Sequence, residues 1–128
     1  MNVESDVRAY LLSEHRSLVV AVLSCAEAVE GTPDDRLGDY LEACLRESGV
    51  FDRLPNVLAG AVDAAGEELR ARPVAGPPYV VVTGVGPVLR ATLDPGRLVV
   101  TVAAFEKGPS GYVRAGRTPE EALRVELR

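Results

Sequence analysis

The sequence lacks a long apolar run, which argues against a membrane-spanning helix. Its longest apolar stretch, SLVVAVLSCAEAV (17–29), is interrupted by Ser17, Ser24 and Glu27, whereas a bilayer span needs about 18 consecutive apolar residues. The first ten residues, MNVESDVRAY, also lack the basic-then-apolar order of a secretory signal. We therefore expect a cytoplasmic protein with no membrane partner.

Aromatic side chains and histidine are scarce. The chain has no Trp, two Phe, four Tyr and one His. So few rings do not make a ready stacking pocket, and one histidine with two isolated cysteines does not make a metal-ligand set. We therefore expect no catalytic set, no metal and no cofactor.

The two cysteines, Cys25 and Cys44, lie in no CxxC or Cys/His spacing. Each falls on the apolar face of a predicted helix, where a free cysteine behaves as a small buried hydrophobe. A disulfide between them stays possible, but disulfides are rare in a reducing cytoplasm. We therefore interpret both residues as buried thiols.

Lysine is almost absent. Lys107 is the only lysine among 14 basic residues, and 19 acidic residues give the chain a net charge of −5. A chain of this charge is a poor partner for nucleic acid or for an anionic membrane. Acidic, lysine-poor usage is typical of a GC-rich genome or of a salt-rich cytoplasm, where net charge preserves solubility.

The residues that are present divide the chain at RARPVAGPP (70–78). Within a single domain, 1–128, the part over 1–72 has apolar residues at helical spacing in three segments. The part over 78–128 has alternating, β-branched segments joined by short turns, which predict an antiparallel meander of three to five strands. The predicted fold is α+β, with three N-terminal helices packed on a C-terminal antiparallel β-meander.

Two local motifs need a decision. The run VVVTGVGP (80–87) looks like the start of a phosphate-binding loop, but no third glycine follows Gly86 and the next residues alternate like a strand. We therefore interpret it as a hairpin turn. At the end of the chain, Thr118 and Glu121 form a capping box that predicts a short helix, whereas LRVEL (123–127) also alternates and leaves a last strand open.

Two sets of residues are candidates for function. The first set is the ligand-binding candidates His15, Tyr40 and Tyr79, for a pocket between the helices and the sheet. His15 lies at the edge of an apolar helical stripe, where it serves as a general base or as a packed boundary residue. The second set is the interaction candidates Arg90, Val99, Ala103 and Phe105, because the strand over 97–106 is apolar on both faces.

The leading hypothesis is a non-catalytic interaction or adaptor module that binds a protein partner or self-associates as a homodimer. The alternative is a small-ligand sensor or an enzyme with its pocket near the ligand-binding candidates. An apolar sheet face that no helix covers favours the first, and a perturbed titrating group in a cavity favours the second.

One long stretch carries a resemblance. After an acidic, arginine-rich helical part, PPYVVVTGVGPVLRATLDPGRLVV (77–100) resembles small uncharacterised proteins of haloarchaea. The resemblance implies a cytosolic protein of unknown function and assigns no site residue. A shorter stretch, GYVRAGRTPEEAL (111–123), is similar to the strand–helix end of antitoxins of the HicB type. The three preceding predicted helices do not belong to that family, so we attribute this similarity to shared capping residues.

Overall fold

The first half of the chain forms four helices where the sequence predicts three. The computed structural model describes residues 2–128. Its helices are α1 (Val3–Glu14), α2 (Arg16–Val29), α3 (Asp34–Glu47) and α4 (Val50–Ala64). The single helix expected over 4–30 is therefore a wrong prediction. It is divided into α1 and α2 at His15, whose backbone is not helical (φ −129°, ψ 25°).

The division at His15 lets two short helices take different directions. The apolar stripe continues across it, from Val7 and Leu11 to Leu18 and Val22, all of which are buried. The helical period therefore gave no sign of a break. The kink allows α1 to pack against α4 and the last strand of the sheet, while α2 packs beside α3.

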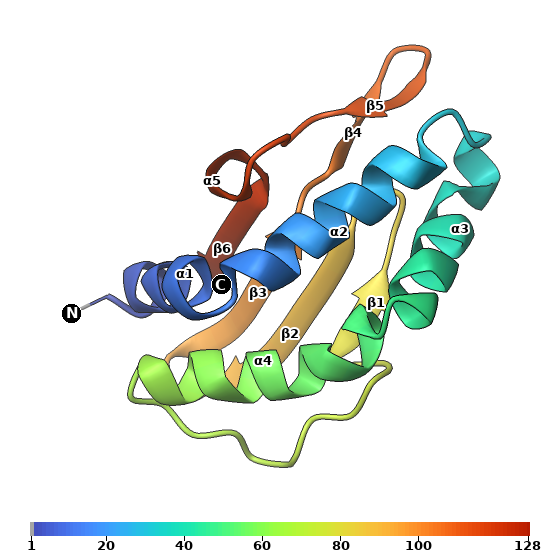
Figure 1. Cartoon of the computed structure of the whole chain (residues 1–128). Coiled ribbons are helices and arrows are strands. Elements are labelled where there is room, and N and C mark those ends of the chain that lie inside the picture. The colour runs from blue at the N-terminus through green and yellow to red at the C-terminus, as the bar shows by residue number, and fades with distance from the viewer. Residues whose placement is uncertain (1) are drawn as a thin grey trace.

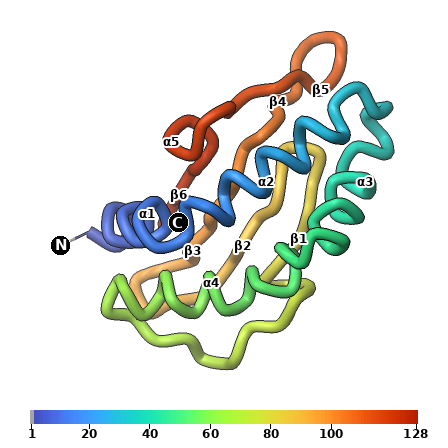
Figure 2. Tube along the Cα trace, viewed as in Figure 1, coloured from blue at the N-terminus to red at the C-terminus, as the bar shows by residue number. Residues whose placement is uncertain are grey.

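The second half of the chain forms two small antiparallel sheets. The strands are β1 (Val80–Val82), β2 (Pro87–Leu93), β3 (Gly96–Val102), β4 (Phe105–Gly108), β5 (Gly111–Arg114) and β6 (Leu123–Leu127). One sheet has the order β1-β2-β3-β6, and β4 pairs with β5 in a separate hairpin. The α+β class is confirmed, and the C-terminal strand β6 lies beside the N-terminal helix α1 (Figure 2).

The VVVTGVGP run makes a hairpin turn between β1 and β2. Thr83 N–H donates to the carbonyl of Gly86 at 3.1 Å, and β1 pairs antiparallel with β2. Gly86 has a φ of +153°, and a Cβ there would collide with the carbonyl oxygen of Val102. Only glycine fits this close approach, so the second glycine serves the turn rather than a phosphate.

The strand expected over 97–106 breaks in the middle. β3 ends at Val102 and β4 begins at Phe105. Between them, Ala103 N–H donates to the carbonyl of Ala122 and Ala104 N–H donates to that of Val85. Both alanines are fully buried, because small side chains let the backbone change partners in a crowded place.

The end of the chain is a single turn that leads into a strand. The helix α5 (Pro119–Ala122) has the predicted capping box between Thr118 and Glu121. It is one turn long, and residues 123–127 form β6, which pairs antiparallel with β3. The strand left open by the alternation of LRVEL is the one that forms.

The main core lies between the helices and one face of the four-stranded sheet. In Figure 1, α2 and α4 cross in front of this sheet, α1 lies beside β6, and α3 lies beside β1. The sheet side chains in this core include Leu89, Ala91, Leu98, Val100 and Leu123. Truncating a fully buried leucine such as Leu98 to alanine costs about 2–5 kcal/mol. None of the helices described over residues 2–128 is long and apolar enough to cross a bilayer.

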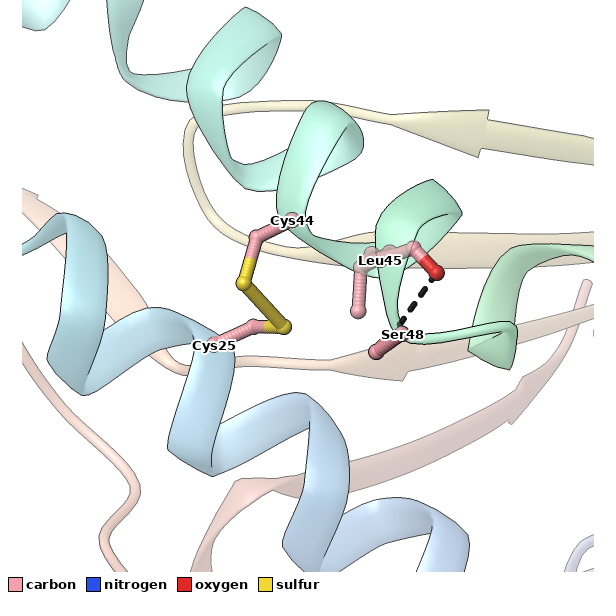
Figure 3. Close-up of a disulfide and its surroundings, with 4 residues drawn as sticks. All are labelled: Cys25, Cys44, Leu45 and Ser48. Carbon is pink, nitrogen blue, oxygen red and sulfur yellow. Dashed lines mark hydrogen bonds between the residues drawn. A yellow bond between two sulfur atoms is a disulfide. The ribbon is translucent and has the colours of Figure 1, made fainter.

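The two cysteines are bonded to each other, which corrects the expectation of buried thiols. Cys25 on α2 and Cys44 on α3 form a disulfide, and their Cα atoms are 5.7 Å apart (Figure 3). Ser48 Oγ donates to the carbonyl of Leu45 at 3.0 Å near the end of α3. The sequence placed each cysteine on an apolar helical face but did not reveal that these two faces meet.

We expect the disulfide to stabilise the helical hairpin. It links residues 19 apart in sequence, and closing a loop of this length in the unfolded chain contributes about 3 kcal/mol. The variant Cys25→Ala/Cys44→Ala and the reduced wild type should both lose about this much free energy of unfolding in urea. An unchanged unfolding midpoint on reduction would contradict the expectation.

Candidate functional site

The face of the four-stranded sheet turned away from the main core, here called the outer face, is rich in arginine. The core takes Leu89 and Ala91 from β2, so strand alternation turns Arg90 to the opposite side. Cross-strand register then places the other members. The long charged side chains of the outer face are Arg90, Arg97, Arg124, Glu126 and Arg128.

Two valines lie among these long side chains. Val99 is opposite Arg90 on β2 and opposite Glu126 on β6, and it is only 5% exposed. Val88 is 7% exposed, and both valines lie outside the main core cluster. Arginine stems cover apolar surface while their guanidinium groups stay in water. The outer face is therefore closed by arginine side chains rather than by helices.

A fifth arginine joins this group from the segment after α4. Arg70 Nη2 lies 3.7 Å from Asp94 Oδ1 in the β2–β3 turn, and Arg128 Nε lies 3.2 Å from Glu126 Oε2. Five arginines and these two acids give the outer face a charge of +3, so a chain of net charge −5 carries −8 elsewhere. The net charge of this surface is therefore opposite in sign to that of the whole molecule.

Three arginines of the outer face have no acidic partner. The ion pairs within residues 2–128 involve other arginines, and none includes Arg90, Arg97 or Arg124. All three side chains are exposed. Their guanidinium donors are therefore available to a bound group.

A cleft opens at one end of the outer face. It has a volume of about 380 Å³ and is lined by Leu69, Arg70, Ala71, Pro78, Tyr79, Arg90, Ala91, Thr92 and Arg97. We call it the arginine cleft, after its three arginines. They come from the segment after α4, from β2 and from β3, so the cleft depends on the folded sheet.

Both edges of the four-stranded sheet are closed. On β6, the carboxylate of Glu4 accepts from Leu127 N–H at 2.9 Å, and Arg8 Nη1 donates to the carbonyl of Leu123 at 2.6 Å. On β1, α3 packs alongside, and Gly38 is so near Thr83 that a Cβ would lie 3.2 Å from its carbonyl carbon. Side chains and a helix that cover an edge prevent pairing with another strand. The outer face therefore offers the open surface that the edges do not.

The structure does not bring the three ligand-binding candidates together. Tyr40 is on α3 and 48% exposed, Tyr79 lines the arginine cleft, and His15 lies at the kink between α1 and α2. Beside His15 there is only a cavity of about 20 Å³ with apolar walls. A cavity of this size holds at most about one water molecule, so it does not serve as a substrate pocket.

His15 has a structural environment. Its Nε2 lies 3.1 Å from Tyr10 Oη, and Tyr10 in turn lies against Gly60 of α4, where a Cβ would collide with the hydroxyl. Burial lowers the pKa of His15 from 6.5, the charge of Arg53 adds to the lowering, and Glu14 opposes it. Through Tyr10, the kink at His15 is therefore linked to α4.

Of the four interaction candidates, two lie on the outer face and two do not. Arg90 and Val99 are cross-strand partners there. Ala103 and Phe105 are buried, at 0% and 2% exposure, because the strand breaks before Phe105 and turns its ring into the core. The expectation that they share a surface with Val99 is therefore corrected.

Arg114, on β5, does not belong to the outer face. Its side chain is only 5% exposed and pairs with Glu30 Oε1 at 3.3 Å. Its Nε donates to the carbonyl of Ala104 at 3.3 Å. It joins the β4–β5 hairpin to the end of α2, which is a structural role.

Sequence reasoning missed Arg70, Arg124 and Arg128 as members of the outer face. For Arg124 the signal was present, because the alternation of LRVEL places it and Glu126 on one side of a strand. For Arg70 the sequence held no signal, since its position depends on the path of the loop after α4. Within residues 2–128, no three His, Cys, Asp or Glu side chains are arranged to hold a metal ion.

Comparison with known proteins gives one match. Residues 5–128 match the family model described as "Domain of unknown function (DUF7988)". No curated protein and no solved structure matches the chain.

The environment of His15 predicts a pH dependence of stability. The pKa of His15 is lower in the folded chain than in the unfolded chain. As the pH falls through the unfolded value of 6.5, the unfolded chain therefore binds the proton first, and the free energy of unfolding decreases. His15→Gln keeps a hydrogen-bonding side chain without a charge. Between about pH 7 and pH 5, wild type should lose more unfolding free energy in urea than His15→Gln. Equal losses would show that His15 does not contribute.

Proposed function

This chain belongs to the DUF7988 family, and we propose that it is a non-catalytic binding module whose outer face takes an acidic segment of another protein. The observation that carries the proposal is the concentration of five arginines on the open face of an acidic molecule. Charge complementarity of this kind guides association and selects partners.

The pattern on the face favours a peptide-like partner. Arg90, Arg97 and Arg124 supply donors without acidic partners of their own. Val88 and Val99 are only 7% and 5% exposed, so they offer a partner little apolar surface. Recognition therefore rests on the guanidinium groups, which match the carboxylates of an acidic segment.

A second copy of the chain is the less favourable occupant. A two-fold dimer through this surface would place arginines against arginines, and like charges across an interface cost free energy. The closed edges of β1 and β6 also oppose pairing of sheets between copies. Of the partners expected from the sequence, another protein therefore fits better than a homodimer.

Nucleic acid is also less favourable. A long polyanion would approach the charge of −8 carried by the rest of the molecule. Single-stranded nucleic acid is usually held by several stacked aromatic rings, and Tyr79 is the ring that lines this region. We therefore argue for an acidic protein segment.

The proposal predicts that the chain binds an acidic peptide through the outer face. The probe is a fluorescein-labelled deca-glutamate peptide, measured by fluorescence anisotropy in low salt. Arg124→Gln should weaken binding about threefold, since an exposed ion pair contributes up to about 1 kcal/mol. The matched control Arg36→Gln removes the same charge from an exposed position on α3 and should change the affinity little.

Three results would overturn the proposal. Equal weakening by Arg124→Gln and Arg36→Gln would mean that overall charge alone attracts the peptide. Tighter binding of a single-stranded oligonucleotide of equal charge would favour nucleic acid. A dimer in light scattering that dissociates when Arg124 is replaced would assign the face to self-association.

We further propose that the chain works in the cytoplasm of a salt-adapted cell, as its acidic, lysine-poor composition and the haloarchaeal resemblance suggest. The packing of α2 on α3 places Cys25 and Cys44 within bonding reach, as the disulfide shows. A reducing cytoplasm opposes such a bond, so we expect this disulfide to be reduced while the chain is in that compartment. Maleimide labelling of acid-quenched cells that express the chain tests this, and two cysteines that label only after reduction would contradict it.

A further inference from the structure

We propose that the arginine cleft binds a compact dianion that carries a phosphate group or two carboxylates. This inference deepens the proposed function and rests on it in part, because Arg70, Arg90 and Arg97 belong both to the cleft and to the outer face. Arg124 belongs to the outer face but lies outside the lining of the cleft. The two binding events can therefore be separated by mutation.

The presence of three arginines in the lining of one cleft is the first support. Arg70, Arg90 and Arg97 come from three segments and line one cavity. Each guanidinium is a planar fork of five donors that matches two oxygens of a phosphate or a carboxylate. Thr92 and Tyr79 line the same cavity and carry hydroxyl groups, which donate to or accept from oxygen.

The charge balance sets the charge of the ligand. Three arginines and Asp94, which pairs with Arg70 at the margin, give a local charge of +2. Without an anion these like charges repel one another, and a dianion neutralises them. The Arg70–Asp94 pair is 3.7 Å long between side chains that are 68% and 95% exposed. Such a pair contributes little, so Arg70 is free to turn to a ligand.

The volume and the walls set the size of the ligand. About 380 Å³ is at the lower end of the range for small-molecule sites and suits a compact molecule. Leu69 and Pro78 form apolar parts of the wall. They leave room for a short carbon body beside the charged group. A phosphate and a dicarboxylate share the required chemistry, and the experiment distinguishes them.

Calorimetric titration of the full chain with inorganic phosphate, and separately with succinate, tests the proposal in a low-salt, mildly alkaline buffer, where both are dianions. We expect at least one of the two to bind with a stoichiometry of one. Arg70→Gln should weaken that binding about tenfold, as for the loss of one charge-assisted contact. Because Arg70 also belongs to the outer face, this variant should weaken deca-glutamate binding about threefold, as for one exposed ion pair. Arg124→Gln should weaken deca-glutamate binding and leave anion binding unchanged, and Arg36→Gln should affect neither.

The outcomes separate this inference from the proposed function. Binding of phosphate alone assigns a phosphate ligand, and binding of succinate alone assigns a dicarboxylate ligand. Anion binding without peptide binding retains the cleft and overturns the peptide proposal. If neither anion binds, the proposal that the cleft is an anion site is overturned. Equal losses in Arg70→Gln and Arg36→Gln overturn it too, because they indicate attraction by charge alone.

A folding control keeps the test decisive. Arg70 is exposed, so Arg70→Gln should keep the thermal unfolding midpoint of wild type. Arg97→Gln provides a second cleft variant from a different strand, and it should weaken both the anion and the peptide. If Arg97→Gln leaves the anion affinity unchanged, the cleft is not the binding site.

Discussion

The packing of α1, α2 and α4 on a single face of the four-stranded sheet is the constraint on which the rest of the structure depends (Figure 1). A sheet covered on one side must close its other side with its own side chains. Here the alternation of β2, β3 and β6 supplies arginines, and Arg90 lies directly opposite Val99, which is only 5% exposed. The same constraint leaves the guanidinium groups of these arginines in solvent, where they are open to a ligand.

The one-sided packing also separates the charges of the molecule. The helices α1–α4 carry eleven acidic residues and five arginines, a net charge of −6, while the outer face carries +3. Some of these acids have a local role in their helix. Asp34 and Asp35, for example, lie in the first turn of α3, where they offset the helix dipole. An acidic helical layer and a basic sheet face follow, so a partner is directed to one side by charge.

Much of the fold could be predicted from the sequence, because turns and caps are local. The VVVTGVGP hairpin, the capping box at Thr118 and the antiparallel pairing all depend on residues close in the chain. The kink at His15, the strand break at Ala103 and the Cys25–Cys44 bond depend on which elements meet in space. The candidate site was predictable in part. Arg90 and Val99 followed from alternation, whereas Arg70 reaches the cleft by a loop path that no local pattern specifies.

The accessibility of the outer-face arginines in the free chain tests the central claim most directly. Phenylglyoxal modifies exposed arginines, and mass spectrometry after digestion gives the rate at each one. We expect Arg90, Arg97 and Arg124 to react as fast as Arg36, and Arg114, whose side chain is 5% exposed, to react much more slowly. Protection of Arg90, Arg97 and Arg124 to the level of Arg114 would mean that another layer covers this face, and would contradict the claim.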